Sequence, residues 1–295
     1  MKYFSFITVF CSALVLTGAE YFVTPADSLQ KAFGKLKPGD TLTLKPGVYR
    51  QGTVKVSVKG TAAKPVIIRG EERSSTIITA WKSLDNAVWE KVKDQRFVYR
   101  TPLKEEVYNV SDLKSERLLL TAPAVQDMEK FRGTFRCEKG FLYVHTFDGK
   151  APGKSLRATV HSGYLFLFER ASHVKIENLT FCGSAHKDPR YSSWAIAIRC
   201  IGTSDITVDN CGFYYNSGGV AFTVKSKNST VRNSFFHRND APGYAEAAQL
   251  FFGGASKNNL AENNIVVNTG VHGVRFYSGA IDDTARNNII VNSRI

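Results

Sequence analysis

The sequence predicts an all-β protein built as a solenoid of short stacked strands. Three observations support this fold class: a repeat of asparagine-containing units in the C-terminal half, an amphipathic segment leading into short strands near the N-terminus, and a β-rich block between them. The chain has 295 residues, of which 43% are hydrophobic and 12% aromatic, and its formal net charge is +13. This composition excludes a disordered chain, a collagen and a bundle of membrane helices.

Residues 1–19 are typical of a secretory signal peptide. Lys2 precedes an apolar run from Tyr3 to Leu16, and Thr17-Gly18-Ala19 follows. The run is too short for a membrane span, and no later segment is apolar enough to cross a bilayer. We therefore expect a secreted or periplasmic protein. Four cysteines would remain, either paired or as buried free thiols: Cys137, Cys182, Cys200 and Cys211.

Residues 20–80 predict an N-terminal capping helix and the first coils. Thr24-Pro25 indicates a helix start, and Leu29, Phe33 and Leu36 recur at helical spacing before a stop at 37–40. Short strands follow at 41–44, 54–58, 65–69 and 76–78, separated by turn residues. An amphipathic helix that leads into short strands is typical of the capped end of a solenoid.

Residues 81–160 differ from both neighbours and predict a small β-rich insertion. Aromatic residues are spread through a charged, irregular stretch. Within it, Lys139-Gly140 separates Gly133–Cys137 from Phe141–His145, which is a hairpin signal, and Asp148-Gly149-Lys150 closes the unit.

Residues 161–295 are expected to form the body of the solenoid. Asparagine occurs 14 times in residues 171–295 and twice before them. Five segments align on asparagines spaced 32, 23, 30 and 24 residues apart: Asn178, Asn210, Asn233, Asn263 and Asn287. Units of this length indicate one coil each. Asparagine tolerates the left-handed backbone of a bend, and stacked amides are expected to form a hydrogen-bonded ladder. An asparagine-rich β-sandwich is the alternative.

Together these segments resemble the right-handed parallel β-helix, or pectin-lyase-like, superfamily of secreted carbohydrate-active proteins. Asp40–Tyr49 followed by Gly60–Gly70 is similar to the opening coils, and the asparagine repeats are similar to the body. The inserted Gly133-Thr134-Phe135, with Phe141–His145, resembles the β insertion of β-helix glycosidases. The resemblance covers nearly all of the mature chain. It implies the fold more than an activity, because this fold hosts lyases, hydrolases, epimerases and adhesins.

The end of the chain lies inside a repeat, at Asn292-Ser293-Arg294-Ile295. Solenoids are capped at both ends, so the coils are expected to lack a C-terminal cap. We expect either an incomplete chain, with catalytic carboxylates beyond residue 295, or a short protein with an exposed end.

A second strand is predicted after each asparagine bend, at 195–199, 221–225, 249–253 and 273–277. Because side chains alternate along a strand, Ile198, Val224, Phe252 and Phe276 are expected inside. Two rows are then expected on one outer face, forming a basic and aromatic strip. They are Ala197, Thr223, Phe251 and Arg275, and Arg199, Lys225, Gly253 and Tyr277.

Long loops at 186–191 and 237–246 enter this face and carry the candidate site. A glycosidase needs two carboxyl groups about 5–9 Å apart, whereas a lyase needs a base and a cation beside a uronate carboxylate. The catalytic candidates are Asp240, Glu246, His237 and Asp188. The substrate-binding candidates are Arg199, Lys225, Arg238, His272, Arg275, Tyr277 and Tyr191. Asp282-Asp283 is a further carboxylate pair or a plain bend. No metal-ligand spacing is present, so a cofactor, calcium, is expected only for a lyase.

We expect a monomeric protein that cleaves glycosidic bonds in a polysaccharide, with hydrolysis favoured over β-elimination. The basic net charge favours an anionic polysaccharide. Export makes nucleic acid a poor partner, and no membrane span is expected. The alternatives are a non-catalytic glycan-binding or cell-surface protein and a purely structural solenoid.

Overall fold

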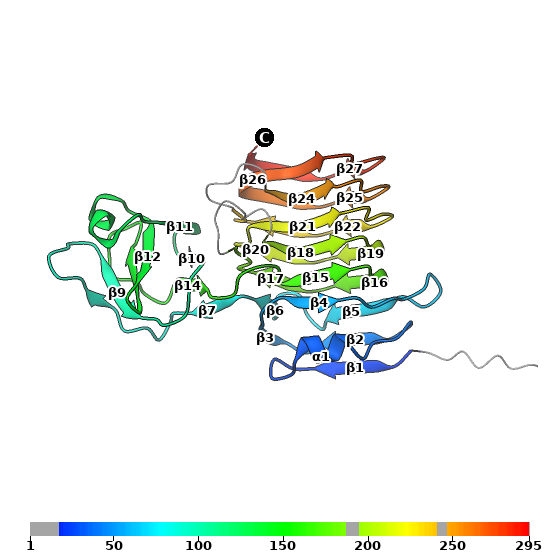
Figure 1. Cartoon of the computed structure of the whole chain (residues 1–295), viewed down its shortest axis with the longest axis horizontal. Coiled ribbons are helices and arrows are strands. Elements are labelled where there is room, and N and C mark those ends of the chain that lie inside the picture. The colour runs from blue at the N-terminus through cyan, green and yellow to red at the C-terminus, as the bar shows by residue number, and fades with distance from the viewer. Residues whose placement is uncertain (1–17, 187–194, 241–246, 295) are drawn as a thin grey trace, which may run out of the picture.

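The structure is a computed structural model that describes residues 18–186, 195–240 and 247–294. A stack of coils rises along one axis, and a smaller lobe formed by residues 81–160 projects from its side (Figure 1). No helix in the described ranges has the length and apolar character needed to span a membrane. The predicted signal peptide lies almost entirely outside them.

The first face of the stack is an eight-stranded sheet in which every neighbouring pair is parallel. Its strands alternate apolar residues toward the core with charged residues toward solvent, as a half-exposed sheet requires. In order they are β1 (Glu20–Val23), β2 (Thr41–Leu44), β5 (Val66–Gly70), β16 (Ser172–Glu177), β19 (Ser204–Asp209), β22 (Thr230–Arg232), β25 (Leu260–Glu262) and β27 (Thr284–Arg286).

The other two faces are the arms of one 12-stranded sheet, joined because the 13-residue strand β26 (Ile265–Tyr277) runs along both. One arm contains β3 (Gly47–Arg50), β6 (Thr76–Thr79), β17 (Thr180–Cys182), β20 (Gly212–Tyr214) and β23 (Phe235–His237). The other contains β24 (Ala248–Gly253), β21 (Gly218–Thr223), β18 (Ile196–Ile201), β15 (Phe166–Glu169) and β4 (Val54–Val56). Strand β28 (Ile289–Arg294) pairs with β26.

Phenylalanine rings fill the interior of the middle coils. Phe181, Phe213 and Phe236 share one register position on β17, β20 and β23. Their ring centroids are 5.2 and 4.6 Å apart, with interplanar angles of 11° and 4°. Burying one such side chain contributes about 1.5–3 kcal/mol. The row therefore fixes the stacking of coils, and with it the corners that carry the site.

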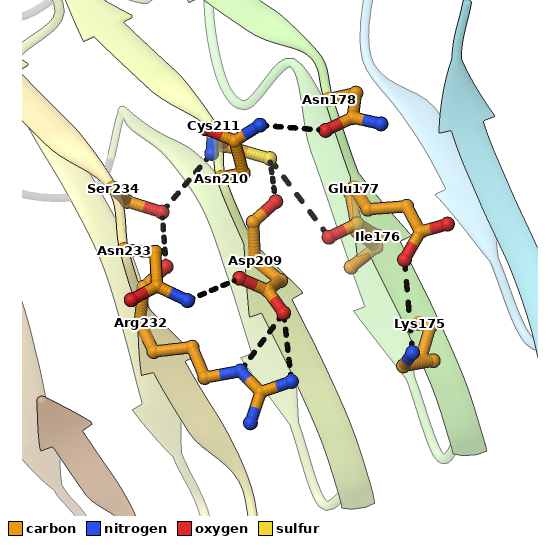
Figure 2. Close-up of polar contacts among 10 residues, drawn as sticks. All are labelled: Lys175, Ile176, Glu177, Asn178, Asp209, Asn210, Cys211, Arg232, Asn233 and Ser234. Atoms are coloured by element: carbon orange, nitrogen blue, oxygen red, sulfur yellow. Dashed lines mark hydrogen bonds and ion pairs between the residues drawn. The ribbon is translucent and has the colours of Figure 1, made fainter.

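The aligned asparagines occupy left-handed bends, as predicted. Asn178, Asn210, Asn233, Asn263 and Asn287 have φ between 50° and 57°. Their side chains are largely at the surface, where Asn210 donates to Asn178 at 2.8 Å (Figure 2).

The predicted amide contact at the bend is present between Asn210 and Asn178, and a buried ladder lies one residue later. Ser234 Oγ accepts from the N–H of Cys211, Asn264 accepts from Ser234, and Asn288 accepts from Asn264, at 3.0–3.1 Å. The residue after the bend turns inward, where backbone N–H groups need partners that water cannot supply.

The predicted N-terminal helix is shorter than expected. Helix α1 spans Leu29–Phe33 and begins after Ser28, whose side chain accepts from Lys31 N–H. The segment before it is a turn in which Asp27 accepts from the N–H and hydroxyl of Thr24 at 2.8 Å. Leu29 and Phe33 are buried, and Phe33 meets Phe166 edge-on at 5.4 Å.

The side lobe is a second eight-stranded sheet with its own hydrophobic core. The hairpin expected around Lys139-Gly140 is present as β12 and β13, which pair antiparallel. The strand order is β7 (Trp81–Ser83), β14 (Leu156–Thr159), β10 (Asn109–Asp112), β11 (Arg117–Thr121), β12 (Thr134–Glu138), β13 (Phe141–His145), β9 (Tyr99–Pro102) and β8 (Glu90–Lys91), with the 3-10 helix η1 at Val125–Lys130. We call residues 81–160 the insertion.

Candidate functional site

A cleft of about 430 Å³ lies between the insertion and the coils. This volume is within the range of small-ligand sites. The insertion contributes Glu116, Arg117, Leu118, Leu120, Arg132, Gly133 and Phe147, and the coils contribute Arg238, Asp240, Asn268, Thr269, Gly270 and Asn292. It is the candidate site, because charged groups from two separately folded units meet there.

Asp240 stands at the corner between β23 and β24. Its N–H donates to the carbonyl of Asn216 at 2.8 Å. The preceding Asn239 is fully buried and donates to Gln249 Oε1 at 2.7 Å. A Cβ atom added to Gly270 would overlap the Asp240 carboxyl group. A glycine at 270 is thus what allows this carboxyl to lie against the neighbouring coil.

Glu116 connects the insertion to the coils. Arg238 donates to Glu116 Oε2 from Nη2 at 3.0 Å and from Nε at 3.3 Å. His237 Nε2 lies 3.8 Å from the same oxygen. These contacts join residues more than 100 positions apart in the sequence. They place a carboxylate, a guanidinium and an imidazole at the edge of the cleft.

The pKa of His237 is shifted. Burial lowers the pKa of its imidazole, the nearby Glu116 carboxylate raises it, and Arg238 lowers it further, with a net shift below the ordinary 6.5. Its Nδ1 is buried and has no hydrogen-bond partner within the described ranges. The ring is therefore expected to be neutral at neutral pH and able to accept a proton.

An aromatic ring and two arginines form the insertion side of the cleft. The guanidinium of Arg117 lies 5.2 Å from the ring centre of Phe147. The ring of Phe147 packs against Gly133, where φ is 68° and any side chain would collide with the ring. Together with Arg132, this wall offers a flat apolar surface beside positive charge, which suits a ligand with both apolar and anionic groups.

The structure brings some predicted residues together and separates others. Asp240 and Arg238 line the cleft, and His237 adjoins it. His272 lies on β26, opposite Ala248 of β24, and does not line the cleft. Three predicted residues lie outside the described ranges: Asp188, Tyr191 and Glu246.

The predicted outer strip has the wrong register. Arg199 is opposite Ala221 rather than Lys225, and the row continues through Phe251 and Arg275. Relative to β18, the pairing of β21 is shifted by four residues from the prediction. Because the shift is an even number of residues, the same side chains point inward in both registers, and the sequence pattern could not distinguish them.

Lys225 consequently leaves the strip. It follows β21 at a left-handed corner with φ of 64°, and the neighbouring Val224 is 51% exposed rather than inside. Phe276 stacks on Phe252 at 5.3 Å as expected, yet remains 48% exposed. Tyr277 is opposite Gly253, as predicted.

The strip residues have aromatic neighbours outside the cleft. Arg199 donates to the Tyr164 hydroxyl at 3.0 Å, and the guanidinium of Arg275 lies 4.6 Å from the ring centre of Tyr277. None of these four residues lines the described cleft. The basic strip and the cleft are therefore separate surfaces of the same solenoid.

Asp283 has a structural role, in agreement with the plain-bend interpretation. It accepts from the N–H of Asn259 at 2.8 Å, from its Nδ2 at 2.9 Å and from Ser256 Oγ at 2.6 Å. Asp282 occupies the bend itself, with φ of 53°. Both carboxylates lie away from the cleft lining.

The insertion residues Glu116, Arg117, Arg132 and Phe147 were missed by the sequence analysis. No periodicity relates them to the coils, because the contact depends on how two separately folded units dock. The available signal was local: Glu116 ends a turn between two strands, and the charged Arg117 follows it at the start of β11.

The cysteines in the described part of the chain form no disulfide. Cys137, Cys182, Cys200 and Cys211 are free thiols, which decides between the two states considered. Within residues 18–186, 195–240 and 247–294, no three His, Cys, Asp or Glu side chains gather as metal ligands.

Comparison with known proteins identifies the architecture. Residues 157–295 match the family model described as a right-handed β-helix region. The chain has the fold of a right-handed parallel β-helix. Among curated proteins, no sequence matches it.

Solved structures are similar to the chain at low sequence identity. A glycoside hydrolase is 10% identical, with coverage of 89% of this chain and 80% of its own and a TM-score of 0.56. An alginate lyase from Paenibacillus sp. str. FPU-7 is 14% identical, with coverage of 92% and 75% and a TM-score of 0.46. A family 28 exopolygalacturonase from Yersinia enterocolitica is 13% identical, with coverage of 92% and 59% and a TM-score of 0.43.

Proposed function

We propose that the protein is a carbohydrate-active enzyme that hydrolyses glycosidic bonds in an anionic polysaccharide, in the cleft at Asp240. The observation that carries the proposal is a carboxyl group held against Gly270 in a cleft that also contains three arginines and an aromatic ring. The β-helix fold, which is shared with a glycoside hydrolase, supports a carbohydrate substrate. A secreted or periplasmic location and a monomeric state belong to the same proposal.

The chemistry assigns each kind of group a task. Asp240 donates a proton to the glycosidic oxygen, which a general acid facilitates by about 10²–10⁴-fold. Arg117, Arg132 and Arg238 bind carboxylate or sulfate groups of the glycan, as guanidinium groups do well. Phe147 provides a surface for a sugar ring. Hydrolysis also needs a second carboxyl group.

Activity on defined glycans tests this function. The protein is incubated with polygalacturonate, alginate, chondroitin sulfate and xylan, and reducing ends are counted. We expect new reducing ends from an anionic member, without absorbance of unsaturated uronate. Asp240→Asn should lower kcat by about 10²–10⁴-fold. The matched control is Asp205→Asn, on β19 at a left-handed position that suits asparagine, and it should retain activity. Equal activity of Asp240→Asn and the parent would refute the role of Asp240.

β-Elimination on a uronate is the second candidate, favoured by His237. Its buried Nδ1 has no partner in the described part of the chain, and its lowered pKa supplies a neutral base. The three arginines would neutralise the uronate carboxylate. Unsaturated products, lost in His237→Gln, would favour elimination over hydrolysis. Binding of a glycan without any turnover would instead favour a glycan-binding protein.

A further inference from the structure

We propose that Glu116, carried by the insertion, is the second carboxylate of the hydrolytic site and acts as the general base toward the attacking water. This inference rests on the proposed hydrolytic function. Glu116 and Asp240 line the same cleft from opposite units. The insertion would then be part of the catalytic centre and not only an addition to the surface of the solenoid.

The contacts of Glu116 leave one oxygen available for water. Arg238 and His237 both approach Oε2. Oε1 has no hydrogen-bond partner within the described ranges, and the side chain is 51% exposed. Arg238 therefore orients the carboxylate of a cleft-lining residue while the second oxygen stays free of protein partners within the described ranges, as a general base requires.

Glu116 and Arg238 both lie at left-handed bends of the backbone. Glu116 and Arg238 have φ of 54° and 53°, in the left-handed region that neither residue type favours. At the corner occupied by Arg238, the next two coils have Asn268 and Asn292, which suit that conformation. A partially exposed ion pair by itself stabilises little, so a role in the cleft explains the Glu116–Arg238 contact better than stability does.

The step conserves atoms and charge. Asp240 transfers its proton to the glycosidic oxygen as the bond from that oxygen to C1 breaks, and the leaving sugar keeps the bonding electrons. A water oxygen bonds to C1, and its proton passes to Glu116. One water is consumed, and the proton returns from Glu116 to Asp240 through solvent. A base-activated water attacks the face opposite the leaving group, so the product has inverted anomeric configuration.

Glu116→Gln in the full chain tests the assignment on the same four glycans. We expect kcat to fall by about 10²–10⁴-fold with KM within about threefold, and the acidic limb of the pH profile of kcat/KM to disappear. The matched control is Glu90→Gln, because Glu90 pairs with Arg100 at 3.2 Å on the insertion, away from the cleft. Thermal melting shows whether both variants fold.

The outcomes separate this inference from the proposed function. A folded Glu116→Gln variant with full turnover, alongside an inactive Asp240→Asn, would overturn the role of Glu116 and leave hydrolysis standing. Retained anomeric configuration in the first product, observed by NMR, would overturn the general-base assignment. Unsaturated products, or no turnover by the unaltered chain, would refute the hydrolytic function and this inference with it.

Discussion

Residues on neighbouring coils help to position Asp240. Asn239 is held by Gln249, the backbone of Asp240 is held by Asn216, and Gly270 leaves room for the carboxyl group. Glu116, in contrast, is held by a partially exposed ion pair with Arg238. Such pairs depend on geometry and are weakened by salt. The two carboxylates therefore differ in rigidity, the coil side being the more firmly built.

At the residue scale, His237 should make stability depend on pH. Because burial lowers its pKa below 6.5, the unfolded chain takes up a proton before the folded one as the pH falls below that value. The free energy of unfolding therefore decreases between neutral and mildly acid pH. His237→Gln should show a shallower decrease in urea unfolding at pH 7.5 and 5.5. An unchanged pH dependence would contradict a buried, neutral imidazole.

At the scale of elements, adjacent asparagines have different tasks. The first of each pair forms the bend, whereas the second turns inward and links coils. Asn264 accepts from Ser234 N–H at 3.1 Å and donates to Val231 O at 3.0 Å and to Asn288 Oδ1 at 2.9 Å. Figure 2 shows the same corner in earlier coils, where Ser234, one coil before Asn264, and Cys211, two coils before it, occupy the inward position.

Substitutions at Asn263 and Asn264 should separate these tasks. Asn264→Ala removes a buried acceptor and leaves the Ser234 N–H without a partner, so we expect a loss of about 1–3 kcal/mol. Asn263→Gly keeps the left-handed bend at an exposed position and should change stability by no more than about 0.5 kcal/mol. Chemical unfolding of both variants measures the difference. Equal losses would show that the inward ladder has no special role.

The sequence predicted elements better than it predicted their pairing. The left-handed bends and the insertion hairpin follow from local chemistry, because asparagine and glycine favour these conformations wherever they occur. The pairing of Arg199 with Ala221 does not follow, since a shift of four residues leaves the inward face unchanged. For the same reason Lys225 was placed on a strand that it only follows.

At the scale of the whole molecule, the site lies between two units with separate cores. The insertion leaves and rejoins the coils at neighbouring points, because Lys82 on β7 is paired with Ala158 on β14. Figure 1 shows the lobe beside the middle coils rather than along the axis. This arrangement lets the lobe vary without interrupting the stack, a common property of insertions whose ends lie close together.

Replacing residues 83–157 by a short Gly-Ser turn should therefore leave a folded solenoid. We expect cooperative unfolding and the circular dichroism of a β-rich protein, because the phenylalanine row and the asparagine ladder remain. Glycan turnover should be lost, since Glu116, Arg117, Arg132 and Phe147 are removed with the insertion. An insoluble or unfolded product would show that the coils depend on the insertion for stability. Full turnover would contradict a site shared by both units.

The sequence by itself determined the repeat, the left-handed bends, the insertion hairpin and the candidates Asp240, His237 and Arg238. These features depend on local backbone preference and on alternation along single strands, which neighbouring residues specify. Only the tertiary structure decided the register of the coils and the ion pair between Arg238 and Glu116, which are 122 residues apart in the chain. That ion pair depends on the packing of two units with separate cores, and no local sequence pattern specifies such packing.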